Sequence, residues 1–225
     1  MIKKVDILGI QLDNYTVREA IMCVERYLSN NVLNTIESIS LQMLIDSETN
    51  PVLKEVMSSL DLAIIGEKEI IQAAGLESMQ RIRETEENDF YFEFFKRIER
   101  NKKSVFLLGD TQEKIDSLKA ELAEDYPKLI FAGEYAVETC VGDLEAVIND
   151  MNATTPDVII SVLPSPMQEQ FLYEHRDKMN ANIWYGIGGV PVHKKKHGVL
   201  ARLKSIIHRG KLVNSCLLYT SDAAD

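Results

Sequence analysis

A glutamine and a glutamate follow a buried strand, where side chains can meet a ligand. The apolar run at residues 158–163 ends in a Pro-Ser-Pro turn that includes Pro166, and Gln168 and Glu169 open the helical pattern behind it. A glutamine amide donates and accepts hydrogen bonds, and a carboxylate accepts them from paired hydroxyls, so the pair suits a nucleobase edge or a sugar. The alternative is a plain helix start, where the helix dipole favours a glutamate. Their place directly after a strand favours a ligand site.

Three glycines end two other expected strands. Gly109 follows the apolar run at residues 105–108, and Gly188 and Gly189 follow the run at 183–187. A missing side chain lets the backbone approach a phosphate, but a tight turn also needs glycine, and for Gly109 the two explanations are equally good. The chain has no Gly-x-Gly-x-x-Gly motif and no Walker loop, which disfavours a dinucleotide or kinase site. It also lacks an Asp-x-Asp motif, so we expect no metal and no cofactor.

The elements that position these residues alternate along the chain. Apolar runs predict strands at residues 5–10, 32–39, 61–66, 105–108, 129–132, 158–163 and 183–187. Helical spacing predicts helices at residues 17–28, 41–47, 51–60, 69–80, 90–100, 111–122, 144–151 and 167–178, with a charged loop at 81–89. Thr16 and Glu19 form a capping box before the first helix. This order predicts an α/β fold with an open, mostly parallel, Rossmann-like sheet and helices on both faces.

The composition fits a single cytoplasmic domain. A chain of 225 residues, 45% of them hydrophobic, can bury one core, and no apolar run reaches the ~20 residues of a membrane span. The N-terminus turns polar too soon for a signal peptide. Cys23, Cys140 and Cys216 lack metal-ligand spacing and an even number, which is typical of a reducing compartment. The net charge of −10 argues against nucleic-acid binding. The sequence is also compatible with a homo-oligomer.

The C-terminal part is basic instead. Residues 193–215 contain no acidic residue, and their apolar residues fall on one face of a helix. This pattern suits an anionic membrane surface, or a helix that packs on the sheet with a solvated basic edge. We therefore expect one α/β domain at residues 1–192, followed by this basic segment. Residues 216–225 resemble a translated sequencing adapter, which would mean that the natural chain continues beyond residue 215.

The ordered motifs resemble the WecG/TagA/CpsF glycosyltransferases, bacterial enzymes of surface-polymer assembly. Residues 105–109 look like that family's strand and glycine turn, and residues 126–133 look like its next strand. Residues 157–170 look like its Gly-x-Pro-x-Gln-Glu segment, with Ser165 in the glycine's place, and residues 187–189 look like its Gly-Gly turn. The resemblance covers nearly the whole chain.

The resemblance implies a reaction and its partners. An N-acetylhexosamine would pass from a UDP-sugar to a polyprenyl-diphosphate-linked sugar, with inversion, during teichoic acid, capsule or exopolysaccharide synthesis. The enzyme would be peripheral to the inner face of the cell membrane. Its substrate-binding residues would be Ser38, Asp89, Gly109, Pro166, Gln168, Glu169, Gly188 and Gly189. Asp89 would contact the sugar or acceptor, or would only cap a helix. The residues at the membrane or diphosphate would be Lys194, Lys195, Lys196, Arg202, Lys204 and Arg209.

Three positions depart from the family near the expected reaction centre. The family usually has Thr-x-Asn after its second strand, where this chain has Glu37, Ser38 and Ile39, and its proposed base aspartate corresponds to Gly66. Glu67, one residue along, can replace that base or can be a solvated loop carboxylate; a general base is worth ~10²–10⁴ in rate.

A second candidate base is His193, just beyond the Gly-Gly turn, although a histidine in a basic loop is more often a surface residue. The departures also leave open a catalytically inactive relative that binds nucleotide sugar or partner proteins of the assembly complex.

Overall fold

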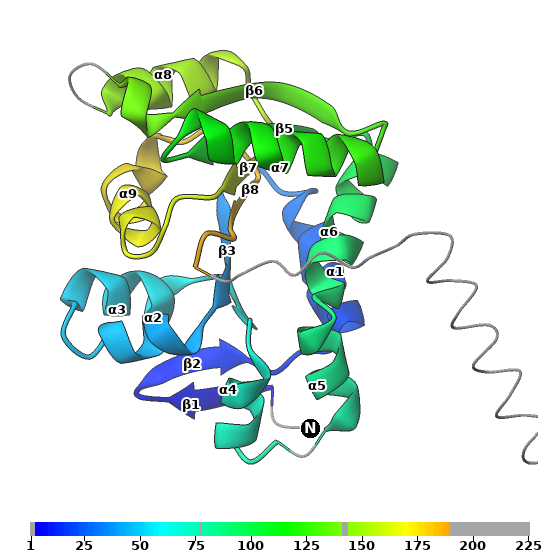
Figure 1. Cartoon of the computed structure of the whole chain (residues 1–225), viewed down its shortest axis with the longest axis vertical. Helices are drawn as coiled ribbons and strands as arrows, with labels where there is room; N and C mark the ends of the chain where they lie inside the picture. Colours follow the sequence, from blue (N-terminus) through cyan, green and yellow to red (C-terminus); the bar gives the residue numbers. More distant parts are fainter. Residues whose placement is uncertain (1–2, 77, 141–143, 190–225) are drawn as a thin grey trace, which may run out of the picture. The chain divides into compact units, whose positions relative to one another are not determined.

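The computed structural model describes residues 3–76, 78–140 and 144–189, which form an eight-stranded sheet (Figure 1). In spatial order its strands are β1 (Lys4–Ile7), β2 (Ile10–Asp13), β4 (Leu62–Ile65), β3 (Asn34–Ile39), β8 (Ile183–Gly186), β7 (Val158–Ser161), β5 (Ser104–Gly109) and β6 (Ile130–Ala136). Only β1 runs antiparallel to its neighbour, and every other neighbouring pair is parallel. The predicted α/β fold with an open, mostly parallel sheet is confirmed.

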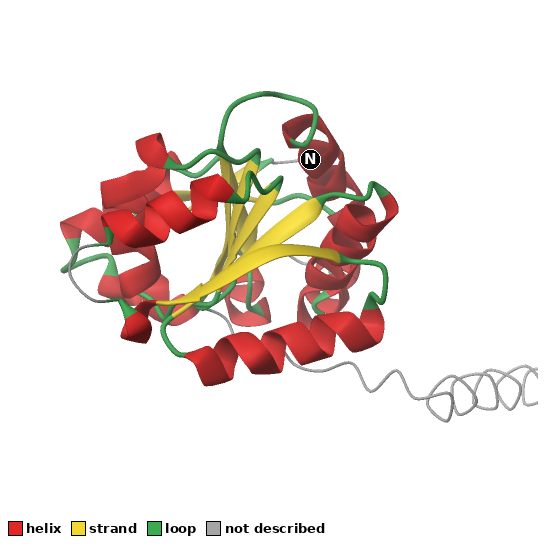
Figure 2. Cartoon of the chain, turned by 90° about the horizontal axis from the view of Figure 1, so that it is seen from above, coloured by secondary structure: helices red, strands yellow, loops and turns green. Residues whose placement is uncertain are grey.

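Helices cover both faces of this sheet (Figure 2). One face, called the α9 face from here on, is covered by α2 (Leu41–Asp46), α3 (Pro51–Ser59), α4 (Lys68–Ala73), α8 (Glu145–Ala153) and α9 (Met167–His175). The opposite face, called the α6 face, is covered by α1 (Val17–Tyr27), α6 (Asp89–Arg100) and α7 (Gln112–Asp125). The remaining helix, α5 (Met79–Glu86), contacts α4 and α6. Each face therefore has its own apolar core.

The central strand β3 divides its residues between these two cores. Ile36 belongs to the core of the α6 face, and Ile39 belongs to that of the α9 face. Because side chains alternate along a strand, Ser38 points with Ile36, and Glu37 points with Ile39. Two adjacent polar residues thus lie on opposite sides of the sheet.

The first strand was expected at residues 5–10, and this prediction is wrong. The chain forms a hairpin there, in which β1 and β2 join at Leu8 and Gly9 with φ values of 53° and 81°. Two positive φ values in a two-residue turn match the twist of an antiparallel hairpin, and glycine adopts such a φ without strain. The apolar residues at positions 5, 7, 8 and 10 suggested one strand and concealed this turn.

The charged loop expected at residues 81–89 is also wrong, because α5 occupies most of it. The helix expected at residues 69–80 ends early, where α4 stops and Gly75 takes a φ of 65°. The buried residues of α5 are Arg81, Glu84 and Thr85. A helix whose buried face is polar has no apolar periodicity to reveal it.

The basic segment expected at residues 193–215 and the adapter-like residues 216–225 lie outside the described residues. Within the ranges that the structure does describe, no helix has the length and apolar character needed to cross a membrane.

Candidate functional site

Two hollows lie on the α6 face at the carboxyl ends of the central strands. The first, of about 40 Å³, is lined by Tyr15, Ser38, Gly66, Arg81, Glu84 and Asn88, among others. The second, of about 300 Å³, is lined by Lys114, Ser117, Glu121, Pro164 and Gly188, among others. Tyr91 lines both. Ligands of open α/β sheets bind outside these strand ends, so the two hollows are the candidate site.

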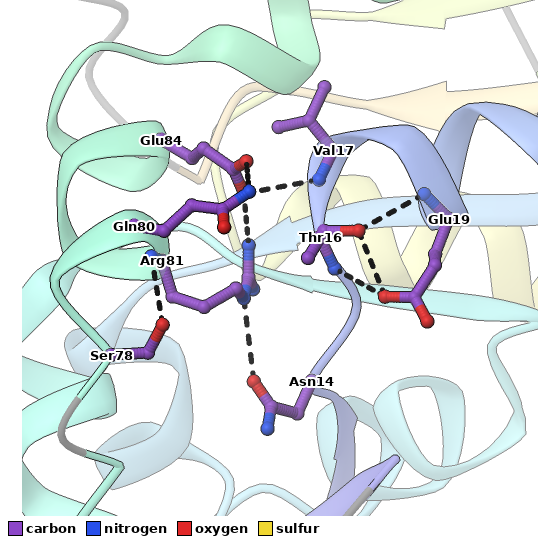
Figure 3. Close-up of polar contacts among 8 residues, drawn as sticks. All are labelled: Asn14, Thr16, Val17, Glu19, Ser78, Gln80, Arg81 and Glu84. Atoms are coloured by element: carbon purple, nitrogen blue, oxygen red, sulfur yellow. Dashed lines mark hydrogen bonds and ion pairs between the residues drawn. The ribbon is translucent and has the colours of Figure 1, made fainter. Parts of the chain in front are cut away.

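Figure 3 shows an ion pair between Arg81 and Glu84, two residues that line the first hollow. Arg81 Nη1 lies 3.3 Å from Glu84 Oε2, and both residues are less than a tenth exposed. Arg81 Nε donates to Asn14 Oδ1 at 3.4 Å. Burial lowers the pKa of Arg81 and the Glu84 carboxylate partly offsets this, so the guanidinium keeps its charge. A fixed positive group therefore faces the hollow.

The same network fixes the first turn of α1. Glu84 Oε2 also accepts the backbone N–H of Val17 at 3.2 Å. The predicted capping box is present, because the Thr16 side chain accepts from Glu19 N–H and Glu19 Oε2 accepts from Thr16 N–H at 3.0 Å. These bonds hold α5 against the start of α1, two segments that are far apart in sequence.

The strand ends on the α6 face supply further polar groups. Ser38 Oγ lies 3.2 Å from the Tyr185 hydroxyl, and both residues line the first hollow. Gly66 N–H donates to Ile39 O at 2.9 Å, which joins the ends of β3 and β4. The expected residue Asp89 begins α6, but its neighbour Asn88 lines the hollow instead, with a φ of 52°.

Glu67 precedes α4 and does not line the first hollow. Its Oε2 accepts the backbone N–H of Leu41 at 2.9 Å, at the start of α2. Its Oε1 accepts no hydrogen bond from the described residues. The carboxylate therefore lies beside Gly66, with one oxygen held and one available.

Gln168 and Glu169 are fully buried and line neither hollow, contrary to the expectation that they contact a ligand. Gln168 Oε1 accepts Gly188 N–H at 3.3 Å, and its Nε2 donates to Glu169 Oε1 at 3.2 Å. Ser165 Oγ donates to Glu169 Oε2 at 2.8 Å. Gln168 thus lies at the Gly188 turn but holds it from the α9 face.

Packing leaves little room for a side chain at the three expected glycines. A Cβ at Gly109 would lie 2.8 Å from Ile115 Cγ1, and one at Gly189 would lie 2.4 Å from Met43 Sδ. At Gly188 it would lie 1.8 Å from Leu163 O. Of the three, only Gly188 lines either hollow.

Pro166, also expected at the pocket, is exposed at the start of α9 and lines neither hollow.

Sequence reasoning missed most residues of the hollows, among them Arg81, Glu84, Asn88 and Tyr91. The first three fall in the supposed charged loop, and Tyr91 falls in an aromatic cluster that was interpreted as core. The one available signal was the spacing of Arg81, Glu84 and Asn88, which places them on one helical face. Within the described ranges, no three His, Cys, Asp or Glu side chains gather as a metal site would require.

Comparisons with known proteins match the glycosyltransferase family that the sequence motifs resemble. The family model described as "Glycosyl transferase WecG/TagA/CpsF family" matches residues 5–191. Two similar proteins come from Staphylococcus aureus, strains NCTC 8325 / PS 47 and MRSA252. Each is 22% identical over 188 residues, which is 83% of this chain and 73% of the relative. Both are described as "N-acetylglucosaminyldiphosphoundecaprenol N-acetyl-beta-D-mannosaminyltransferase".

Proposed function

We propose a function on one premise: the chain belongs to the WecG/TagA/CpsF family of glycosyltransferases. Its two relatives are named as transferases of N-acetyl-β-D-mannosamine to N-acetylglucosaminyldiphosphoundecaprenol. By the same chemistry, this chain is a hexosyltransferase that moves an N-acetylhexosamine from a UDP-sugar to a polyprenyl-diphosphate-linked sugar, with inversion. The product enters a cell-surface polymer such as teichoic acid, capsule or exopolysaccharide.

The observation that carries this proposal is that the two hollows share Tyr91 in their linings and so are neighbours. Transfer between two substrates requires both to lie side by side, and adjacent hollows allow this. The second hollow, of about 300 Å³, is at the lower limit of small-ligand sites, about 300–1,000 Å³. It takes the nucleotide of the donor between Lys114 and the Gly188 turn. The transferring sugar then points to the first hollow, towards Ser38 and Arg81.

The proton acceptor in this scheme is Glu67. The acceptor hydroxyl attacks the anomeric carbon, its proton passes to Glu67, and the bond to UDP breaks. Glu67 Oε1 is available, whereas Glu84 is held by Arg81, Val17 N–H and Gln80 Nε2. A carboxylate with so many donors is the weaker base.

The departures from the family count less against catalysis once the two faces of the sheet are known. Glu37 and Ile39 are fully buried and point to the α9 face, so they are not altered groups of the hollow. Ser38, between them, supplies a hydroxyl to the hollow. Only Gly66 remains as a changed position at the reaction centre.

The acceptor in this proposal is attached to a lipid, so the reaction takes place at a membrane surface. The basic residues of 193–215 are candidates for that contact, as an anionic surface attracts each nearby Lys or Arg by about 1 kcal/mol. The enzyme is accordingly placed at the inner face of the cell membrane.

Two measurements test the proposal. Calorimetry with UDP in excess EDTA should show binding, and the protein should transfer sugar to a polyprenyl-diphosphate-linked acceptor. Glu67→Gln should lower turnover by ~10²-fold or more, because a general base contributes that much. Glu48→Gln, an exposed carboxylate changed in the same way, should leave turnover intact. Binding of UDP without turnover on several lipid-linked acceptors would instead indicate a catalytically inactive relative.

A further inference from the structure

The α9 face holds a second acidic residue against Glu169. Glu37 lies on β3 beside Gly186 of β8, and its side chain is fully buried. Trp184 Nε1–H donates to Glu37 Oε1 at 3.4 Å, and no donor among the described residues reaches Oε2. Gln168 lies over Gly186, the partner of Glu37 in the sheet, and its amide bonds Glu169, so the carboxyl groups of Glu37 and Glu169 come together there and interact. Two buried carboxyl groups are therefore neighbours on this face.

A hydrogen bond between two carboxyl groups requires a proton on one of them. Glu37 and Glu169 form no ion pair with any described residue, and the side chains that contact them are the neutral Trp184, Gln168 and Ser165. Burial first, and the neighbouring carboxylate second, raise the pKa of Glu37 well above its ordinary value. Burial also raises the pKa of Glu169. Like charges at such contact cannot both persist at neutral pH.

The environment decides which residue carries the proton. Glu169 accepts from Ser165 Oγ, from Gln168 Nε2 and from its own backbone N–H, and it lies in the first turn of α9. Donors and a helix N-terminus both favour the ionised form. Glu37 accepts one long bond, from Trp184, and the Gln168 amide lowers its pKa less than burial and the Glu169 carboxylate raise it. The proton therefore belongs to Glu37.

The pair is connected to the rim of the second hollow through Gln168. Gln168 lies directly over Gly186, where a Cβ would come within 2.4 Å of its Nε2. Its amide bonds Glu169 on one side and Gly188 N–H on the other. The contacts thus run from Trp184 through Glu37, Glu169 and Gln168 to the turn.

We propose that Glu37 is a positioning residue for the donor site, a neutral acid whose O–H donates to Glu169 and thereby holds Gln168 against the Gly188 turn. The assignment of the donor site rests on the proposed function, but the shared proton does not. Glu37→Gln keeps a donor to Glu169 and an acceptor for Trp184, and it cannot ionise. Glu37→Leu keeps the volume but removes both.

The first test measures the proton itself. Infrared spectra of the wild-type chain at neutral pH should show the C=O band of a protonated carboxylic acid. This band should be lost in Glu37→Gln and kept in Glu48→Gln, the exposed control. A wild-type spectrum without this band at neutral pH overturns the proposal, and so does a band that Glu37→Gln leaves unchanged.

The second test measures the dependence on pH. Because the folded-state pKa of Glu37 is raised, its contribution to stability is lost as pH rises through that folded value. Between the unfolded-state pKa and this higher folded-state pKa, the unfolding equilibrium constant of the wild type should rise by up to ~10-fold per pH unit, relative to Glu37→Gln, and it should level off above the folded-state value. Hydrogen exchange at Gly188 N–H should accelerate over the same range in the wild type and at all pH values in Glu37→Leu. Identical pH profiles for wild type and Glu37→Gln contradict the proposal.

The third test is UDP affinity. It should fall with rising pH in the wild type and stay constant in Glu37→Gln. If the wild type binds no UDP at any pH, the proposed function fails, while the infrared and unfolding results still decide the role of Glu37.

Discussion

Polar side chains at the same strand ends lie in opposite environments on the two faces of the sheet. On the α6 face, Arg81 and Glu84 keep opposite charges at the wall of a hollow. On the α9 face, Glu37 and Glu169 are sealed from solvent and share one proton. Ser38 and Glu37 are neighbours in sequence, yet each belongs to a different one of these environments.

The difference separates residues that can meet a substrate from residues that position them. A polar group at a hollow has bonding capacity left for a ligand, whereas a sealed group must find all of its partners within the protein. Gln168 is the instructive case, because its amide bonds are directed to Glu169 and Gly188. The turn at Gly188 is where the two environments meet.

The largest effect is expected from breaking the ion pair on the α6 face. Arg81→Met leaves the Glu84 carboxylate buried without its cation, which should lower the free energy of unfolding by about 3–5 kcal/mol. Urea unfolding measures this. Lys68→Met is the control, because the Lys68–Glu86 pair is 39% and 47% exposed, and solvent screens so exposed a pair that its loss should change stability little. Equal losses in both variants would show that the wall of the hollow is not a buried charged site.

A smaller loss of stability should follow from a substitution at Gly188, the turn between the two faces of the sheet. In Gly188→Ala the new Cβ meets a backbone oxygen, Leu163 O, so the turn must move. We expect a loss of about 1–3 kcal/mol in stability, together with weaker UDP binding.

Gly109→Ala is the matched control for this turn. Its Cβ meets a side-chain atom of Ile115 that can shift, so both losses should be smaller. Unchanged UDP binding in a folded Gly188→Ala would separate the turn from the donor site.

The smallest effect should come from the hydroxyl of Tyr91, a residue that lines both hollows. The Tyr91 hydroxyl is buried and has no partner among the described residues. Tyr91→Phe should therefore raise the free energy of unfolding of the ligand-free protein by about 1 kcal/mol, while weakening donor binding about 5–10-fold.

Tyr126→Phe provides the opposite case, because the Tyr126 hydroxyl donates to Phe92 O at 3.0 Å. That variant should lose about 1 kcal/mol and bind the donor normally. Thermal unfolding and calorimetry distinguish the two variants, and weaker folding of Tyr91→Phe without ligand would contradict the assignment.

The sequence predicted the strand ends but not the face on which each side chain lies. Apolar runs located β7 and β8, so Gln168 and Gly188 were expected close together, as they are. The face of Gln168 depends on which helices cover which side of the sheet, and no local pattern encodes that. Glu37 and Ser38 illustrate the same limit, since a shift of one residue exchanges the two faces. The helix α5 was missed because its buried side chains are polar.

The pairing of β3 with β8 has a consequence for synthesis of the chain. These neighbours at the centre of the sheet are Asn34–Ile39 and Ile183–Gly186, from opposite ends of the described chain. Until the ribosome has released β8, the growing polypeptide exposes one long edge of β3, five of whose six residues are buried in the finished fold. Unpaired apolar edges recruit other chains. The nascent protein is therefore most prone to aggregate before β8 has emerged from the ribosome, and a chaperone that shields β3 would act in that interval.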